Sequence, residues 1–205
     1  MLLLSEVLHG VCCKSDKTDR EYAMSDEPWI DPRNIAAIVY DDGVAVDSLL
    51  SVFAADLSAS GVRLGGVIHV PRSEPGCGPG APLQLRDVAT GEQIPLCRET
   101  GAQRCALDPA GLELAAERVR EAGEAAAELV FLSRFGRQEA AGRGYSSALS
   151  QAVRSGRPVL MAVRRGMVDN WFAATGGVGT LLDARLWVLK NWWQELHGRG
   201  SSAIV

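Results

Sequence analysis

Three arginines and three glycines are concentrated in the segment SRFGRQEAAGRGY, which runs from Ser133 to Tyr145 between a predicted buried strand and a predicted helix. Guanidinium groups form charge-assisted hydrogen bonds to anions, and the N–H groups at a helix N-terminus attract negative charge. Seven arginines but one acidic residue, Glu139, lie between residues 134 and 165. This positive field predicts an anion-binding loop. Its candidate ligand residues are Ser133, Arg134, Gly136, Arg137, Gly142, Arg143 and Gly144. The alternative is that several of these arginines are solvated or pair with the glutamate-rich segment 113–128.

A second loop, YDDGVAVDSLL, follows the first predicted strand, at the position where a phosphate-binding loop would lie. Such a loop requires small residues, a lysine for the β- and γ-phosphates and a serine or threonine for magnesium. Here there are two adjacent carboxylates and one glycine, and no lysine occurs between Lys17 and Lys190. Lysine-dependent nucleotide hydrolysis is therefore not expected. Asp41 and Gly43 remain candidate ligand contacts, although an aspartate at this place also serves to end a loop.

Other reactive side chains are weaker candidates. His69 lies in a predicted strand, where a single histidine is more often structural than catalytic. The five cysteines have no CxxC spacing, which favours neither a disulfide framework nor a zinc site and fits a reducing cytoplasm. Trp192 and Trp193 are adjacent on a predicted helix and cannot both face one core, so we expect them at a homo-oligomer interface.

Composition sets the class of protein that must position these residues. The 205 residues are 47% hydrophobic and 22% charged, which is typical of one soluble globular domain. A net charge of −4 and a pI near 5.4 disfavour general nucleic-acid binding. The apolar opening MLLLSEVLHGVCC is too short to span a membrane, and no longer apolar run follows, so membrane insertion is not expected.

Strands and helices are predicted to alternate along one domain, 35–198. Residues 1–34 are expected to form a flexible leader, in which Met24 is an alternative start, and 199–205 a tail. Short β-branched or apolar runs predict strands, and apolar residues at helical spacing predict helices. The pattern predicts an α/β fold with a mostly parallel sheet flanked by helices and a β-hairpin insertion. Strands are expected at 35–40, 62–70, 83–88, 93–96, 103–108, 128–133 and 158–163, and helices at 46–61, 110–126, 148–153, 168–174 and 181–196.

The order of these motifs resembles an uncharacterised bacterial family that is often encoded beside molybdate-transport genes. That family in turn resembles the P-loop nucleoside triphosphatases of the thermophile and cancer-related type. The resemblance covers about residues 35–175, and RFGRQEAAGRG is its most specific stretch. A hairpin motif, D-x-x-TGE, is matched by Asp87, Thr90, Gly91 and Glu92. The departures fall on the catalytic parts: Asp41 to Ser48 replace the GKT loop, and Ser133 to Gly136 replace the acidic metal ligands.

The resemblance and the residues together imply a non-hydrolytic, P-loop-like protein with a degenerate phosphate loop. We expect it to bind a small anionic ligand, either an oxyanion such as molybdate or tungstate or a nucleotide, in molybdenum handling. Magnesium is expected only with a nucleotide. One alternative is an unconventional nucleoside-triphosphate phosphohydrolase that holds a metal through Asp41, Asp42 or Glu139. Another is a dimeric interaction protein of a molybdate-transport or cofactor-assembly system, which associates through its tryptophan-rich C-terminal helix.

Overall fold

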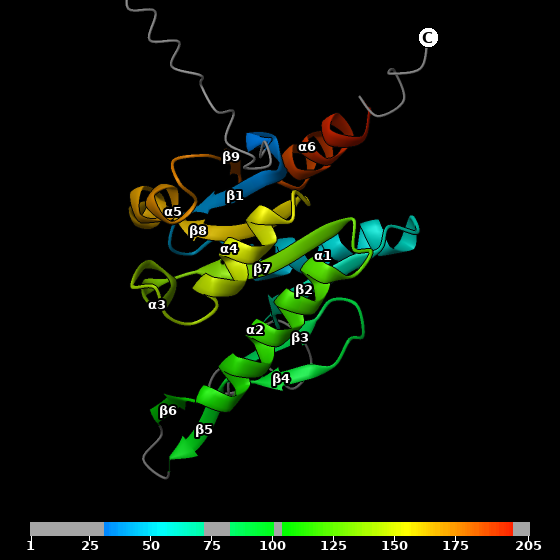
Figure 1. Ribbon diagram of the computed structural model, residues 1–205. Helices are drawn as coiled ribbons and strands as arrows, with labels where there is room; N and C mark the ends of the chain where they lie inside the picture. The colour runs from blue at the N-terminus through cyan, green and yellow to red at the C-terminus, as the bar shows by residue number, and fades with distance from the viewer. Residues whose placement is uncertain (1–30, 72–82, 101–103, 199–205) are drawn as a thin grey trace, which may run out of the picture.

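Four apolar runs of the sequence form the parallel centre of a sheet in the computed structural model, which describes residues 31–71, 83–100 and 104–198. In the described residues this sheet has seven strands in the order β4-β3-β2-β7-β8-β1-β9 (Figure 1). Nearly every residue of the central strands is buried, as a sheet covered by helices on both faces requires. The predicted α/β class is therefore confirmed. The central strands are β1 (Ile35–Tyr40), β2 (Leu64–His69), β7 (Leu129–Phe135) and β8 (Val159–Arg164).

Helices cover the two faces of the sheet and bury one apolar cluster each. On one face lie α1 (Val46–Ala59) and α6 (Leu186–Gly198). On the other lie α2 (Pro109–Glu124), α4 (Ser146–Arg154) and α5 (Val168–Ala174). Helix α2 begins as its sequence predicts, because the Asp108 carboxylate accepts the N–H of Ala110 and a proline occupies the first turn. The short helices η1 (Pro32–Asn34), α3 (Arg137–Ala140) and η2 (Arg165–Met167) lie in connections.

The predicted hairpin extends the sheet beyond β2. Strands β3 (Gln84–Asp87) and β4 (Gln93–Pro95) pair antiparallel, and β3 pairs antiparallel with β2. Two further strands, β5 (Cys97–Thr100) and β6 (Arg104–Leu107), form a separate two-stranded sheet. The segment between Cys97 and Leu107 thus adds a second hairpin, of which the sequence predicts only the later strand.

The C-terminal segment differs from the prediction. Residues Thr180–Asp183 form β9, parallel to β1 at one edge of the sheet, and α6 begins at Leu186 rather than Leu181. Leu182 is buried whereas Leu181 is 44% exposed, which is the alternation of a strand. Gly179 allows the approach to β9, because its φ is +139° and a Cβ there would clash with Trp171. A strand of four residues is too short to separate from the helix pattern that follows it.

The expectation that Trp192 and Trp193 face outward is wrong. Both are buried in the cluster beneath α1 and α6, and they are 5% and 8% exposed. Trp192 Nε1 donates to the Arg33 carbonyl at 2.9 Å, and Trp193 packs its ring against His197. Large indole rings span enough of the helix circumference for neighbours to enter one core. Trp187, which is 58% exposed, is the outward tryptophan of α6, and homo-oligomerisation remains a prediction.

Some predictions concern residues outside the described ranges. These are residues 1–30 of the leader, with Met24, and the tail 199–205. Residues 31–34, which the sequence assigns to the leader, include η1, and Asn34 Nδ2 donates to the Gly156 carbonyl at 2.9 Å. No helix within the described residues is long and apolar enough to cross a membrane.

Candidate functional site

The parallel strands deliver polar residues to one edge of the sheet, here called the carboxyl edge because β1, β2, β7, β8 and β9 all end there. Tyr40 lies beside Arg164 in the register of β1 and β8, and Val39 lies beside Asp183 in the register of β1 and β9. The loop after β1, the loop after β7 and η2 after β8 consequently meet at this edge. Ligands of open parallel sheets bind beyond the same ends of the strands.

An ion pair between Arg134 and Asp47 joins β7 to the first turn of α1. Arg134 Nε donates to Asp47 Oδ1 at 2.8 Å and Nη2 contacts Oδ2, so the pair is bidentate. The guanidinium lies over the Tyr40 ring, 5.8 Å from its centroid. Burial opposes the charge on Arg134, but the hydrogen bonds to Asp47 and the charge of its carboxylate, with smaller contributions from Tyr40 and Tyr145, together raise the pKa of Arg134. The pair fixes the end of β7 against α1.

A buried hydrogen bond between His69 Nδ1 and Ser133 Oγ lies beside this ion pair. Ser133 is the one non-glycine residue with positive φ, +45°, among the described ranges, and the register between β7 and β8 shifts there. Such a bulge turns the following side chain, here Arg134. Burial, with a smaller contribution from the nearby Arg134 charge, lowers the pKa of His69 to about 4. His69 is therefore neutral at physiological pH and pairs with Ser133 as a hydrogen-bonding partner.

Glu139 fills the inside of the loop that follows β7. Its carboxylate accepts the N–H of Gly136 at 3.0 Å, and a Cβ at Gly144 would clash with its Oε1. Burial raises the pKa of Glu139, although hydrogen bonds to the backbone of Gly136 and Tyr145 act in the opposite direction. The Tyr145 hydroxyl donates to the Arg134 carbonyl at 2.9 Å and ties the end of the loop to β7. The interior of the loop thus already holds one anionic group of the chain itself.

Two exposed ion pairs connect the end of β8 to the loop after β1. Arg164 Nη1 lies 2.8 Å from Asp42 Oδ1, and Arg165 Nε lies 3.0 Å from Asp41 Oδ1. The arginine side chains are 54% and 65% exposed. The bond to Asp41 raises the pKa of Arg165, so its charge is permanent. These are accessible guanidinium groups whose partners are themselves exposed.

Known sequences match most of this chain, including every strand that ends at the carboxyl edge. Residues 35–192 match the family described as "Protein of unknown function (DUF2478)". The chain belongs to this family. The DUF2478 chain is also 38% identical over 172 residues to a molybdenum import ATP-binding protein, ModC 2, of Bradyrhizobium diazoefficiens. That match covers 83% of this chain and 19% of the relative, so the chain spans about a fifth of the relative's length.

A solved structure shares the fold of this DUF2478 chain. It is the solution structure of a human cancer-related nucleoside triphosphatase, with a TM-score of 0.57 and 14% sequence identity. The likeness covers 83% of this chain and 98% of that chain. The nucleoside-triphosphatase-like fold expected from the order of the motifs is confirmed, and at this identity the likeness concerns the fold alone.

The structure of this DUF2478 chain brings some predicted site residues together and separates others. Ser133 and Arg134 lie near the end of β7, where Ser133 bonds to His69 and Arg134 to Asp47. Asp41 pairs with Arg165 instead, and Gly43 has a φ of +88° in the loop after β1. Gly136 and Gly144 contact Glu139, and Gly142 has a φ of +70° in the turn between them. Arg137 and Arg143 are exposed on the loop, where Arg143 Nε donates to Gln138 at 2.8 Å. Ligand contact by these residues stays a prediction.

Three residues of the edge are not predicted as site residues from the sequence: Asp47, Arg164 and Arg165. Each lies at the end of a strand or at the start of the following helix, and this position is the signal that could have found them. Arg157, by contrast, is structural, because it donates to the Gly123 carbonyl in the last turn of α2 and to the Ala127 carbonyl just beyond this helix. Cys97 is disulfide-bonded, contrary to the expectation of unpaired cysteines.

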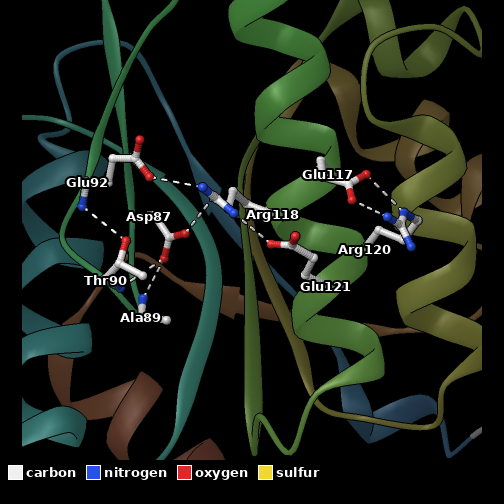
Figure 2. A network of polar contacts seen from close by, with 8 residues as sticks. All are labelled: Asp87, Ala89, Thr90, Glu92, Glu117, Arg118, Arg120 and Glu121. Atoms are coloured by element: carbon white, nitrogen blue, oxygen red, sulfur yellow. Dashed lines mark hydrogen bonds and ion pairs between the residues drawn. The ribbon is translucent and has the colours of Figure 1, made fainter.

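The hairpin motif forms a separate network between the hairpin and α2 (Figure 2). Asp87 Oδ1 accepts the N–H groups of Ala89 and Thr90 at 2.8 and 3.1 Å and so closes the turn. Arg118 of α2 reaches Asp87, Glu92 and Glu121 at 3.3, 3.0 and 2.9 Å. The motif thus joins the hairpin to α2. No group of three or more His, Cys, Asp or Glu side chains in the described ranges could hold a metal ion.

Proposed function

We propose that this chain binds an anionic ligand at the carboxyl edge without hydrolysing it, and that the ligand is an oxyanion such as molybdate or tungstate, or the phosphate of a nucleotide. One observation carries the proposal. Arg164 ends the central strand β8 and Arg165 begins η2. Both side chains are more than half exposed, and each pairs with an exposed aspartate of the loop after β1. An anion with more charge than a carboxylate can replace Asp41 and Asp42 on these guanidinium groups.

The relatives support the choice of ligands. The 38% identical relative is a molybdenum import ATP-binding protein, which makes molybdate, tungstate and ATP the first ligands to test. For the same reason, we propose a role in molybdenum handling. Hydrolysis is not part of the proposal, because no lysine lies between Lys17 and Lys190. The carboxylates that a metal would need are also engaged separately, Asp41 and Asp42 by arginines and Glu139 inside its loop.

Calorimetric titration of the full chain with molybdate, tungstate, sulfate, ATP and GTP, with and without magnesium, tests the proposal. The Arg164→Ala/Arg165→Ala variant is expected to weaken binding by about tenfold or more, because hydrogen bonds to charged groups are worth about 1.5–3 kcal/mol each. Arg63→Ala is the matched control. Its side chain is 65% exposed, as is that of Arg165, but it lies where β2 begins, at the opposite edge.

Two results would contradict the proposal. Unchanged affinity in the Arg164→Ala/Arg165→Ala variant would remove the assigned site, and an equal loss in Arg63→Ala would show that only net charge matters. Arg137→Ala/Arg143→Ala separately tests the contribution of the loop after β7. Phosphate release from ATP or GTP in the same samples, above that of a protein-free blank, would contradict non-hydrolytic binding and favour the phosphohydrolase alternative.

A further inference from the structure

A cavity of about 320 Å³ opens at the carboxyl edge beside Arg165. It lies between the ends of β1 and β9 and the start of α5, and its walls are Val39, Arg165, Val168, Leu181, Leu182 and Asp183. Its volume is near the lower end of the range for small-molecule pockets, which suits one ring system rather than a large ligand. The cavity is continuous with the proposed anion site, because Arg165 lines it and also pairs with Asp41.

The walls of this cavity combine an aliphatic floor with one cation. Four of its six residues are valine or leucine, and Leu181 is 44% exposed. A bare oxyanion has no apolar surface with which to cover these side chains. The Arg165 guanidinium is planar and weakly hydrated, so it can stack on an aromatic ring while its N–H groups bond to a phosphate. The negative charge of Asp183 also helps to raise the pKa of Arg165.

We propose that this cavity holds the base of a nucleoside phosphate whose phosphate lies on Arg164 and Arg165. The inference rests on the proposed function and narrows it, since it selects a nucleotide over an inorganic oxyanion. The ring covers Leu181 and Val168 from solvent, and the phosphate takes over the contacts of Asp41 and Asp42. Affinity then has two separable sources, apolar contact in the cavity and charge at the end of β8.

Inorganic tripolyphosphate separates these two sources, because it has the charge of a nucleotide but no ring. Calorimetry on the full chain is expected to show ATP or GTP binding about tenfold or more tighter than tripolyphosphate, as stacking of a base typically contributes. Leu181→Thr is expected to weaken nucleotide binding several-fold and to leave tripolyphosphate affinity unchanged. Val168→Thr, an isosteric change in the same cavity, is expected to act in the same direction.

Leu107→Thr is the matched control, because Leu107 is also 44% exposed and also lies in a strand, away from this cavity. Neither ligand should bind differently to it. Equal affinities of nucleotide and tripolyphosphate, with both dependent on Arg164 and Arg165, would overturn the base site and leave the anion site standing. Equal loss of both ligands in Leu181→Thr would also overturn it. The absence of binding by every anion would overturn both proposals.

Discussion

Two clusters of arginine and carboxylate differ in how completely each arginine is enclosed. In the hairpin network, three nitrogens of Arg118 face three different carboxylates, which come from the hairpin and from α2 (Figure 2). At the carboxyl edge, Arg164 and Arg165 each face one aspartate of a surface loop. In the first arrangement the arginine joins the hairpin to α2, and each of its three nitrogens already has a carboxylate partner. The second leaves guanidinium N–H groups in solvent and can exchange its partner for a ligand.

The two clusters also differ in how many of their polar side chains are buried. Besides the exposed pairs, the carboxyl edge holds three buried polar side chains, His69, Ser133 and Glu139, which are hydrogen-bonded. The hairpin network has one buried carboxylate, Asp87, which has two backbone donors. We therefore expect acid to destabilise the carboxyl edge before the hairpin network. Loss of Asp87 should lower the free energy of unfolding without changing ligand affinity.

The largest expected effect is on acid stability through His69. Its pKa is about 4 in the fold against 6.5 ordinarily, so below pH 6.5 the unfolded chain takes up a proton that the buried ring does not. Stability is therefore present above pH 6.5 and is lost as the pH falls toward 4. At about 1.4 kcal/mol per pKa unit, this loss is about 3 kcal/mol.

Urea unfolding of His69→Asn at pH 7, 5.5 and 4 measures this contribution. Asparagine can still bond to Ser133, and it does not titrate, so the variant should lose about 3 kcal/mol less than the unaltered chain on acidification. His197→Asn, at an exposed histidine of α6, should keep the original pH dependence. Parallel curves for the unaltered chain and His69→Asn would place the acid sensitivity elsewhere.

Asp87→Ala is expected to lower the free energy of unfolding by about 2 kcal/mol, because it removes a buried acceptor of two backbone N–H groups and a partner of Arg118. Anion affinity should not change, since the network lies away from the carboxyl edge. Asp56→Ala removes an exposed aspartate paired with Lys190 and should cost less than about 1 kcal/mol. A change in ligand affinity in Asp87→Ala would break the division between the two clusters.

The sequence predicts the parallel centre of the fold well, because β1, β2, β7 and β8 are short continuous apolar runs between loops. It fails at β9, where Thr180–Asp183 is short and merges with the pattern of α6. It also fails for Trp192 and Trp193. Their burial depends on where α6 lies against α1 and on the Arg33 carbonyl, and neither is encoded in the spacing of the two residues.

The candidate site is predictable only where it is continuous in sequence. Ser133 and Arg134 stand out because arginines and glycines follow them directly. Their partners His69 and Asp47 are 64 and 87 residues away, and they meet through the order and register of parallel strands. Arg164 and Arg165 read as two more surface arginines until β8 is placed beside β1. The role of Glu139 depends on the path of its own loop, which residue types alone do not reveal.

The smallest expected effect tests whether the edge aspartates compete with a ligand. Asp41→Asn/Asp42→Asn should tighten binding of molybdate, or of whichever anion binds the unaltered chain, by roughly two- to tenfold, since an exposed ion pair is weak and a ligand competes with it for the arginine. Glu117→Gln/Glu124→Gln is the matched control, because these two glutamates pair with the exposed Arg120 and carry the same charge far from the edge. It corrects for the loss of negative net charge, which alone would also favour anion binding.

If the control tightens binding equally, Asp41 and Asp42 act only through long-range charge. If Asp41→Asn/Asp42→Asn weakens binding, the aspartates hold the arginines in place for the ligand, and the difference between the two arginine clusters becomes one of exposure alone.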